Sequence, residues 1–166
     1  YRAIKVHPRL GGPALGSREF RSIAQASHDN GCVLFVCTYP LGRAGQGLGD
    51  SLLADLEVAV AAAPATRMVL LHGGAVDLLR YIEFCRANEH LLLDLSWTLM
   101  KYAKSSIDED LAYAFSSFDS RVCVGTDYPW YSPSEVLDRL GPMLRDLDAV
   151  KRSNILHANI EDYLAG

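Results

Sequence analysis

Five residues with chemically useful side chains stand at the ends of five short apolar runs. They are His7, Cys37, His72, Asp94 and Asp127. Imidazole, thiolate and carboxylate groups are the ligands that divalent metals take in proteins, and a metal bound among them could activate a water molecule. This chemistry requires that the five side chains converge, so the elements around them must bring the ends of the runs together.

The apolar runs are typical of buried strands, and helical patterns separate them. The predicted strands are 3–6, 32–36, 68–71, 91–95 and 122–124. The first predicted helix begins after a cap at Ser17 and ends at Gly31, and the second covers 51–63 after a cap at Asp50. The third covers 76–87, and the fourth covers 111–118 after a cap at Asp108. The fifth begins with a capping box at 132–135, and the last covers 155–164. Alternation of strand and helix at this spacing predicts an α/β domain, residues 1–166, with a parallel sheet whose carboxyl edge carries the chemistry.

Four segments resemble the amidohydrolase superfamily, in the branch called amidohydrolase-2 that contains lactonases and non-oxidative decarboxylases. Residues 125–130, Gly-Thr-Asp-Tyr-Pro-Trp, with 118–122 before them, resemble the last barrel strand of that family. Residues 69–74 resemble its sixth strand and 4–8 its fourth, and 154–156 with Asn159 resemble its closing helix. The resemblance implies a (β/α)8 TIM barrel of which this chain supplies strands four to eight, the C-terminal portion.

The resemblance also implies a divalent metal, zinc by expectation, with manganese or another ion as alternatives. The family's first strand carries a His-x-His pair that binds the metal, and this sequence has none. The family's fifth strand usually ends in a metal-binding His, where this chain has Cys37. Either residues upstream are absent from this chain or the metal site has decayed.

Residue roles follow from the same resemblance. Asp127 matches the aspartate that binds the metal and takes a proton from the attacking water, although a carboxylate here could instead cap the following helix. His72 matches a histidine that polarises the substrate carbonyl or supports the metal, with a buried, satisfied histidine as the alternative. Cys37 could replace the missing histidine as a thiolate ligand or could be an ordinary buried cysteine.

Further residues are candidates for binding substrate. Lys5 and His7 share one face of their strand because side chains alternate, and Arg9 could hold a carboxylate bidentately. Asp94 also ends a strand, and Ser96, Trp97, Trp130 and Tyr131 lie in segments that could shape a pocket.

Composition excludes several classes of function. The net charge of −4 argues against nucleic-acid binding, and no apolar run approaches the ~18 residues that span a bilayer. Four cysteines without a Cys-x-x-Cys pair indicate a reducing compartment, by expectation the cytoplasm. Five parallel strands would leave two open edges, so a homo-oligomer is a possible assembly.

The sequence therefore predicts a metal-dependent hydrolase that acts on a lactone, ester or amide carbonyl of a small, carboxylated molecule. The alternatives are non-oxidative decarboxylation at the same site, or a non-catalytic, degenerate barrel that binds a small acid or a partner subunit. Two other motifs do not carry function. Gly-Asp-Ser-Leu at 49–52 spells a serine esterase motif away from any strand end, and the glycines at 42–49 lack the Lys of a P-loop.

Overall fold

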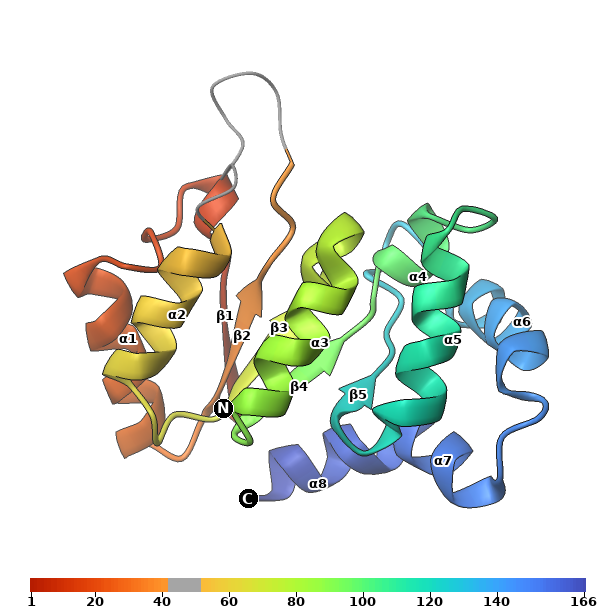
Figure 1. Ribbon diagram of the computed structural model, residues 1–166. Coiled ribbons are helices and arrows are strands. Elements are labelled where there is room, and N and C mark those ends of the chain that lie inside the picture. The colour runs from red at the N-terminus through yellow and green to blue at the C-terminus, as the bar shows by residue number, and fades with distance from the viewer. Residues whose placement is uncertain (42–51) are drawn as a thin grey trace.

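The computed structural model describes residues 1–41 and 52–166 and shows a parallel sheet with helices along it (Figure 1). The strands are β1 (Ala3–Val6), β2 (Val33–Cys37), β3 (Met68–Leu71), β4 (Leu91–Asp94) and β5 (Val122–Cys123). They lie in the order β1-β2-β3-β4-β5, so each strand pairs with the next one in the sequence. Parallel neighbours need long crossover connections, which the helices supply. The five predicted strands are confirmed, each to within one residue at either end.

Four helices cover one face of this sheet (Figure 1). They are α1 (Arg18–Asp29), α2 (Leu52–Ala62), α3 (Leu78–Ala87) and α5 (Ile107–Ser117). Every second strand residue faces them, and Leu34, Leu70 and Leu93 pack with helix side chains such as Phe20 and Phe115 in one buried cluster. Burying each such side chain contributes about 1.5–3 kcal/mol, so this layer is the main source of stability.

The opposite face of the sheet is divided into an apolar lower part and a polar upper part. In the lower part Val33, Val69 and Leu92 form a second buried cluster, against which side chains of α8 (Asn159–Ala165) pack. The Tyr163 hydroxyl of α8 donates hydrogen bonds to the backbone carbonyls of Met68, at 3.0 Å, and His90. Because α8 closes the amino ends of the strands, the polar residues gather at the carboxyl ends.

Two predicted caps are confirmed and one is wrong. The Ser17 hydroxyl accepts from the Phe20 N–H, and Ser132 forms the predicted capping box at the start of α6 (Pro133–Leu144). Asp108, however, does not cap a helix that starts at 111. Helix α5 begins at Ile107, and the Asp108 carboxylate instead accepts from the Lys104 N–H at 3.0 Å and pairs with Arg139 of α6.

The C-terminal helical region is longer than predicted. It begins at α7 (Ala149–Ser153), which Asp148 caps through a 2.9 Å bond from the Lys151 N–H, and continues through a π-helical segment (Asn154–Ala158) into α8. The short α4 (Thr98–Lys101) was not predicted.

Three interpretations lie outside the described residues: the Asp50 cap, the glycine-rich loop and most of the Gly-Asp-Ser-Leu motif. Within residues 1–41 and 52–166, no helix combines the length and the apolar character that crossing a membrane would require.

Candidate functional site

A cavity of about 450 Å³ lies at the carboxyl ends of the strands. Its lining comprises Lys5, His7, Arg9, Leu10, Tyr39, His72, Trp97, Asp127 and Trp130. Seven of these residues were singled out from sequence: Lys5, His7, Arg9, His72, Trp97, Asp127 and Trp130. The structure brings these seven together from segments that follow or belong to β1, β3, β4 and β5, whereas their individual roles stay predictions.

The β1 side of the cavity is cationic. Lys5 and His7 point into it because they alternate with Val6, which is buried among the helices. Arg9 lies in a 3₁₀ turn (Pro8–Leu10), and its guanidinium carbon sits 5.1 Å from the centre of the Tyr39 ring. Burial, and then the charges of Lys5 and Arg9, lower the pKa of His7, so its imidazole is held neutral.

His72 stands on a turn held by hydrogen bonds from two threonines. The backbone at His72 has φ of 70°, and the next three residues also have positive φ. The Thr98 hydroxyl donates to the His72 carbonyl at 2.6 Å. The Thr38 hydroxyl donates to the Leu71 carbonyl and accepts from the Gly74 N–H at 2.9 Å. Backbone in this region is strained for residues other than glycine, and such strain is concentrated at functional sites.

Asp127 occupies a tight turn in the segment that follows β5, which ends at Cys123. Its φ is 51°, and its carbonyl accepts from the Trp130 N–H at 3.1 Å. The alternative role as a helix cap does not apply, because α6 begins at Pro133 and Ser132 caps it. The Asp127 side chain therefore lies in the cavity wall without serving the following helix.

An aromatic cluster forms the rest of the wall. The Trp97 ring lies 5.5 Å from Trp130, 6.0 Å from Tyr131 and 6.1 Å from Tyr39, measured between ring centres. Tyr39 was missed as a site residue from sequence. Its position two residues after Cys37 could have found it, because alternation places both on the same side of an extended segment.

Three buried nitrogen atoms of cavity residues have no hydrogen-bond partner among the described residues. They are His7 Nδ1, Arg9 Nε and Trp97 Nε1. Because these atoms have almost no accessible area, they lie behind the cavity surface rather than on it. The charges of Lys5 and Arg9, which do line the cavity, favour an anionic ligand.

Two predicted site residues lie outside the cavity lining. The Asp94 side chain is almost fully buried and accepts hydrogen bonds from the N–H and the hydroxyl of Ser96. Burial raises the pKa of the Asp94 carboxyl, and the hydrogen bonds from Ser96 partly offset this rise. Cys37 is fully buried, and this burial raises the pKa of its thiol. Its role as a thiolate ligand stays a prediction, because a bound metal would itself deprotonate the thiol.

The metal expectation was compared with the donor groups present. Within the described part of the chain, no three His, Cys, Asp or Glu side chains gather in a way that could hold a metal ion. The cavity lining includes Asp127, His72 and His7, and these do not form a complete ligand set.

Sheet, helices and cavity together define part of a (β/α) barrel with a cavity at its carboxyl edge. No protein-family profile and no curated protein matches the sequence. Among solved structures, an uncharacterized TIM-barrel protein from Bordetella bronchiseptica has 21% identity and a TM-score of 0.80, over 99% of this chain and 57% of that one.

Two further structures are similar over most of this chain. A proposed amidohydrolase from Staphylococcus aureus has 14% identity and a TM-score of 0.67, over 100% of this chain and 65% of that one. A dihydroxybenzoic acid decarboxylase from Polaromonas, solved with bound manganese and the inhibitor 2-nitroresorcinol, has 12% identity and a TM-score of 0.65, over 93% and 56%. At such identities the likeness establishes the fold, a partial TIM barrel. The chain spans between half and two thirds of each of these proteins.

Proposed function

We propose that the protein is an enzyme of the amidohydrolase type that hydrolyses a lactone, ester or amide of a small, carboxylated molecule. One observation carries the proposal: the cavity brings Asp127 and His72 together with the cationic Lys5 and Arg9 at the carboxyl edge of a parallel sheet. This edge is where TIM-barrel enzymes place their active sites.

Five of the cavity residues have a role in this proposal. The Asp127 carboxylate acts as a general base and takes a proton from the water that attacks the carbonyl carbon. When the bond between the carbonyl carbon and the leaving group breaks, Asp127 gives this proton to the leaving group. Lys5 and Arg9 bind the substrate carboxylate. Trp130 and Trp97 enclose the remainder of the molecule.

A divalent metal, zinc or alternatively manganese, is part of the proposal. The bound manganese in the Polaromonas decarboxylase supports it. Because the described residues do not supply a complete ligand set, a metal here would need ligands beyond Asp127 and its neighbours, and no step of the reaction is assigned to it.

Non-oxidative decarboxylation of an aromatic acid is the second candidate. The rings of Tyr39, Trp97 and Trp130 line the same cavity as the cationic groups, an arrangement that suits a planar acid. The similarity to a dihydroxybenzoic acid decarboxylase also supports this reaction.

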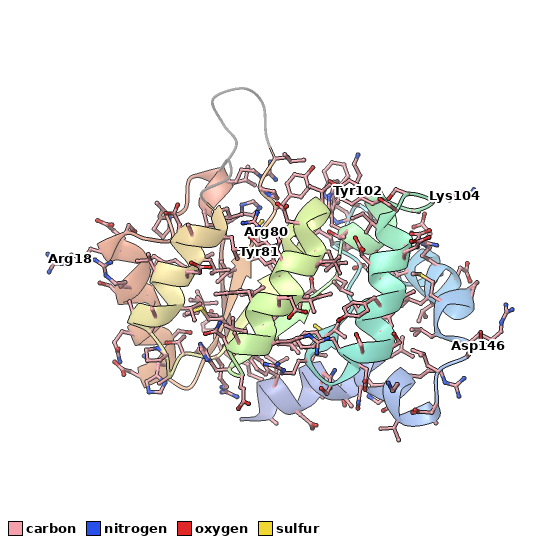
Figure 2. All side chains as sticks on the ribbon, in the orientation of Figure 1. Arg18, Arg80, Tyr81, Tyr102, Lys104 and Asp146 are labelled. Carbon is pink, nitrogen blue, oxygen red and sulfur yellow. The ribbon has the colours of Figure 1, made fainter. Side chains whose placement is uncertain are left out.

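The test compares Asp127→Asn with Asp146→Asn. Asp146 is a matched control because it is exposed and does not line the cavity (Figure 2). The purified proteins are assayed with lactones, aryl esters and 2,6-dihydroxybenzoate, with separate detection of released acid and carbon dioxide, and metal content is measured by mass spectrometry. We expect Asp127→Asn to lower turnover by about 100-fold or more, as loss of a general base does. The Asp146→Asn variant should retain full activity.

Equal activity and metal content in both variants would contradict the proposal. A wild-type protein that binds small acids yet turns over none of the panel would instead support the non-catalytic barrel.

Assembly and location complete the proposal. Among the described strands, β1 and β5 form the two edges of the sheet, so we propose a homo-oligomer that covers an edge, which light scattering after size-exclusion chromatography would detect. All four cysteines are free, which supports a reducing compartment such as the cytoplasm.

A further inference from the structure

The surroundings of His72 Nδ1 fix which ring nitrogen carries the hydrogen. Nδ1 lies 3.1 Å from the Ser96 carbonyl oxygen and 3.3 Å from the Ser96 hydroxyl oxygen. A carbonyl oxygen only accepts hydrogen bonds, so the neutral ring must donate from Nδ1 to make this contact. The hydrogen then belongs to Nδ1, and Nε2 is left with a lone pair.

Asp94 removes the competing possibility that Ser96 donates to the ring. Its Oδ1 accepts from the Ser96 hydroxyl and also from the Ser96 N–H, at 3.1 Å. Because the single hydroxyl hydrogen is given to Asp94, the Ser96 oxygen presents only lone pairs to His72. Both neighbours of Nδ1 are therefore acceptors.

Packing keeps this arrangement rigid. Asp94, Ser96 and His72 are each at most 6% exposed. A Cβ built on Gly125 would lie 3.3 Å from the Ser96 Cβ and 3.4 Å from Asp94 Oδ2, so the chain after β5 passes directly against the pair. Burial raises the pKa of Asp94, while its bonds from Ser96 and the nearby His72 favour the carboxylate. The pair thus has little freedom to rearrange.

We propose that Asp94 and Ser96 are positioning residues that hold His72 as the Nδ1–H tautomer, so that its Nε2 lone pair faces the cavity. Nε2 has no partner within the described residues, and the ring lines the cavity. A neutral His72 in this form accepts a proton at Nε2 and cannot donate one from Nε2 to a substrate carbonyl. Of the two roles that the sequence suggested for His72, this excludes polarisation of a carbonyl by the neutral ring. The inference rests on the proposed function only in treating the cavity as the reaction site.

The test reads the tautomer directly, without substrate. Protein labelled with ¹⁵N-histidine is stripped of metal with EDTA and studied by long-range ¹H–¹⁵N NMR at about pH 8.5, above the ordinary imidazole pKa. His72→Gln assigns the resonance. We expect the Nδ1–H form in the wild type. Ser96→Ala removes one of the two acceptors, so the tautomer ratio should move towards Nε2–H by about fivefold, the value of one neutral hydrogen bond.

Two variants control for structural effects. Ser96→Thr keeps the hydroxyl and should retain most of the Nδ1–H population. Ser27→Ala removes another fully buried hydroxyl, which donates to the Cys32 carbonyl, and should leave the His72 signal unchanged.

A wild-type His72 in the Nε2–H form would overturn the inference even if every variant failed to fold. So would an unchanged ratio in folded Ser96→Ala. These outcomes are independent of the Asp127→Asn assay, because the tautomer is measured in the absence of metal and turnover.

Discussion

Replacing Gly74 by alanine should unfold the turn that carries His72. Gly74 has φ of 72°, and a Cβ placed on it would lie 2.0 and 2.2 Å from two ring carbons of Tyr81. Tyr81 belongs to α3 and is only 2% exposed, so its ring cannot move aside (Figure 2). Left-handed backbone costs about 1–2 kcal/mol for alanine, and overpacking in a core costs about 1–3 kcal/mol. The free energy of unfolding should therefore fall by about 2–5 kcal/mol.

Urea denaturation followed by circular dichroism measures this loss. Gly141→Ala is the matched control, because Gly141 lies within α6 and no atom lies within 4 Å of a Cβ built there. Alanine favours a helix interior by about 1 kcal/mol over glycine, so this control should be stabilised.

A second background separates the two costs. In Tyr81→Leu protein the steric cost should largely disappear, and Gly74→Ala should then cost only about 1–2 kcal/mol for the backbone. The reasoning is refuted if Gly74→Ala costs less than about 1 kcal/mol in the native background, or the same amount in both backgrounds.

Two further predictions concern groups far from the cavity. Burial raises the pKa of the Cys85 thiol to about 12, above its value in the unfolded chain. The contribution of this thiol to stability is therefore complete below about pH 9 and is lost as the pH rises towards 12. The urea midpoint should be lower at about pH 10.5 than at about pH 8, and this difference should be smaller in Cys85→Ala. Tyr163→Phe removes the hydrogen bonds to the carbonyls of Met68 and His90 and should cost about 1–3 kcal/mol, with faster amide hydrogen exchange in α8; unchanged exchange would mean that the hydroxyl does not hold this helix.

Strands β3 and β4 could be predicted because their apolar runs are nearly continuous, as expected for strands buried on both faces. The helical boundaries near the C-terminus could not, because distant partners decide them. Asn159 Nδ2 donates to the carbonyls of Asp119, at 2.6 Å, and Val122, at 2.8 Å, and Asn154 donates to the Asp119 side chain. These contacts hold one continuous helical region where the local pattern predicts a helix from 155 alone.

The candidate site was predictable where a residue lies at or shortly after the carboxyl end of a strand. His72 directly follows β3, Asp127 lies shortly beyond the end of β5 at Cys123, and a parallel sheet places both ends at one edge. The behaviour of Asp94 was not predictable in this way. Its carboxylate accepts from the Ser96 N–H and hydroxyl instead of lining the cavity, and no local pattern in the sequence indicates these contacts.

The face of the sheet opposite helices α1, α2, α3 and α5 has an apolar lower part and a polar upper part, and this division has an evolutionary consequence. Tyr163 and the cluster of Val33, Val69 and Leu92 secure the lower part without contributing to the cavity lining. Most cavity side chains are supplied by strand ends and connecting segments, which stand above that layer. Ligand preference can therefore drift under selection while the fold persists. Libraries randomised at Arg9, Tyr39 and Trp130 should yield mostly folded proteins with altered ligand preferences, whereas libraries at the lower cluster should yield mostly unfolded ones.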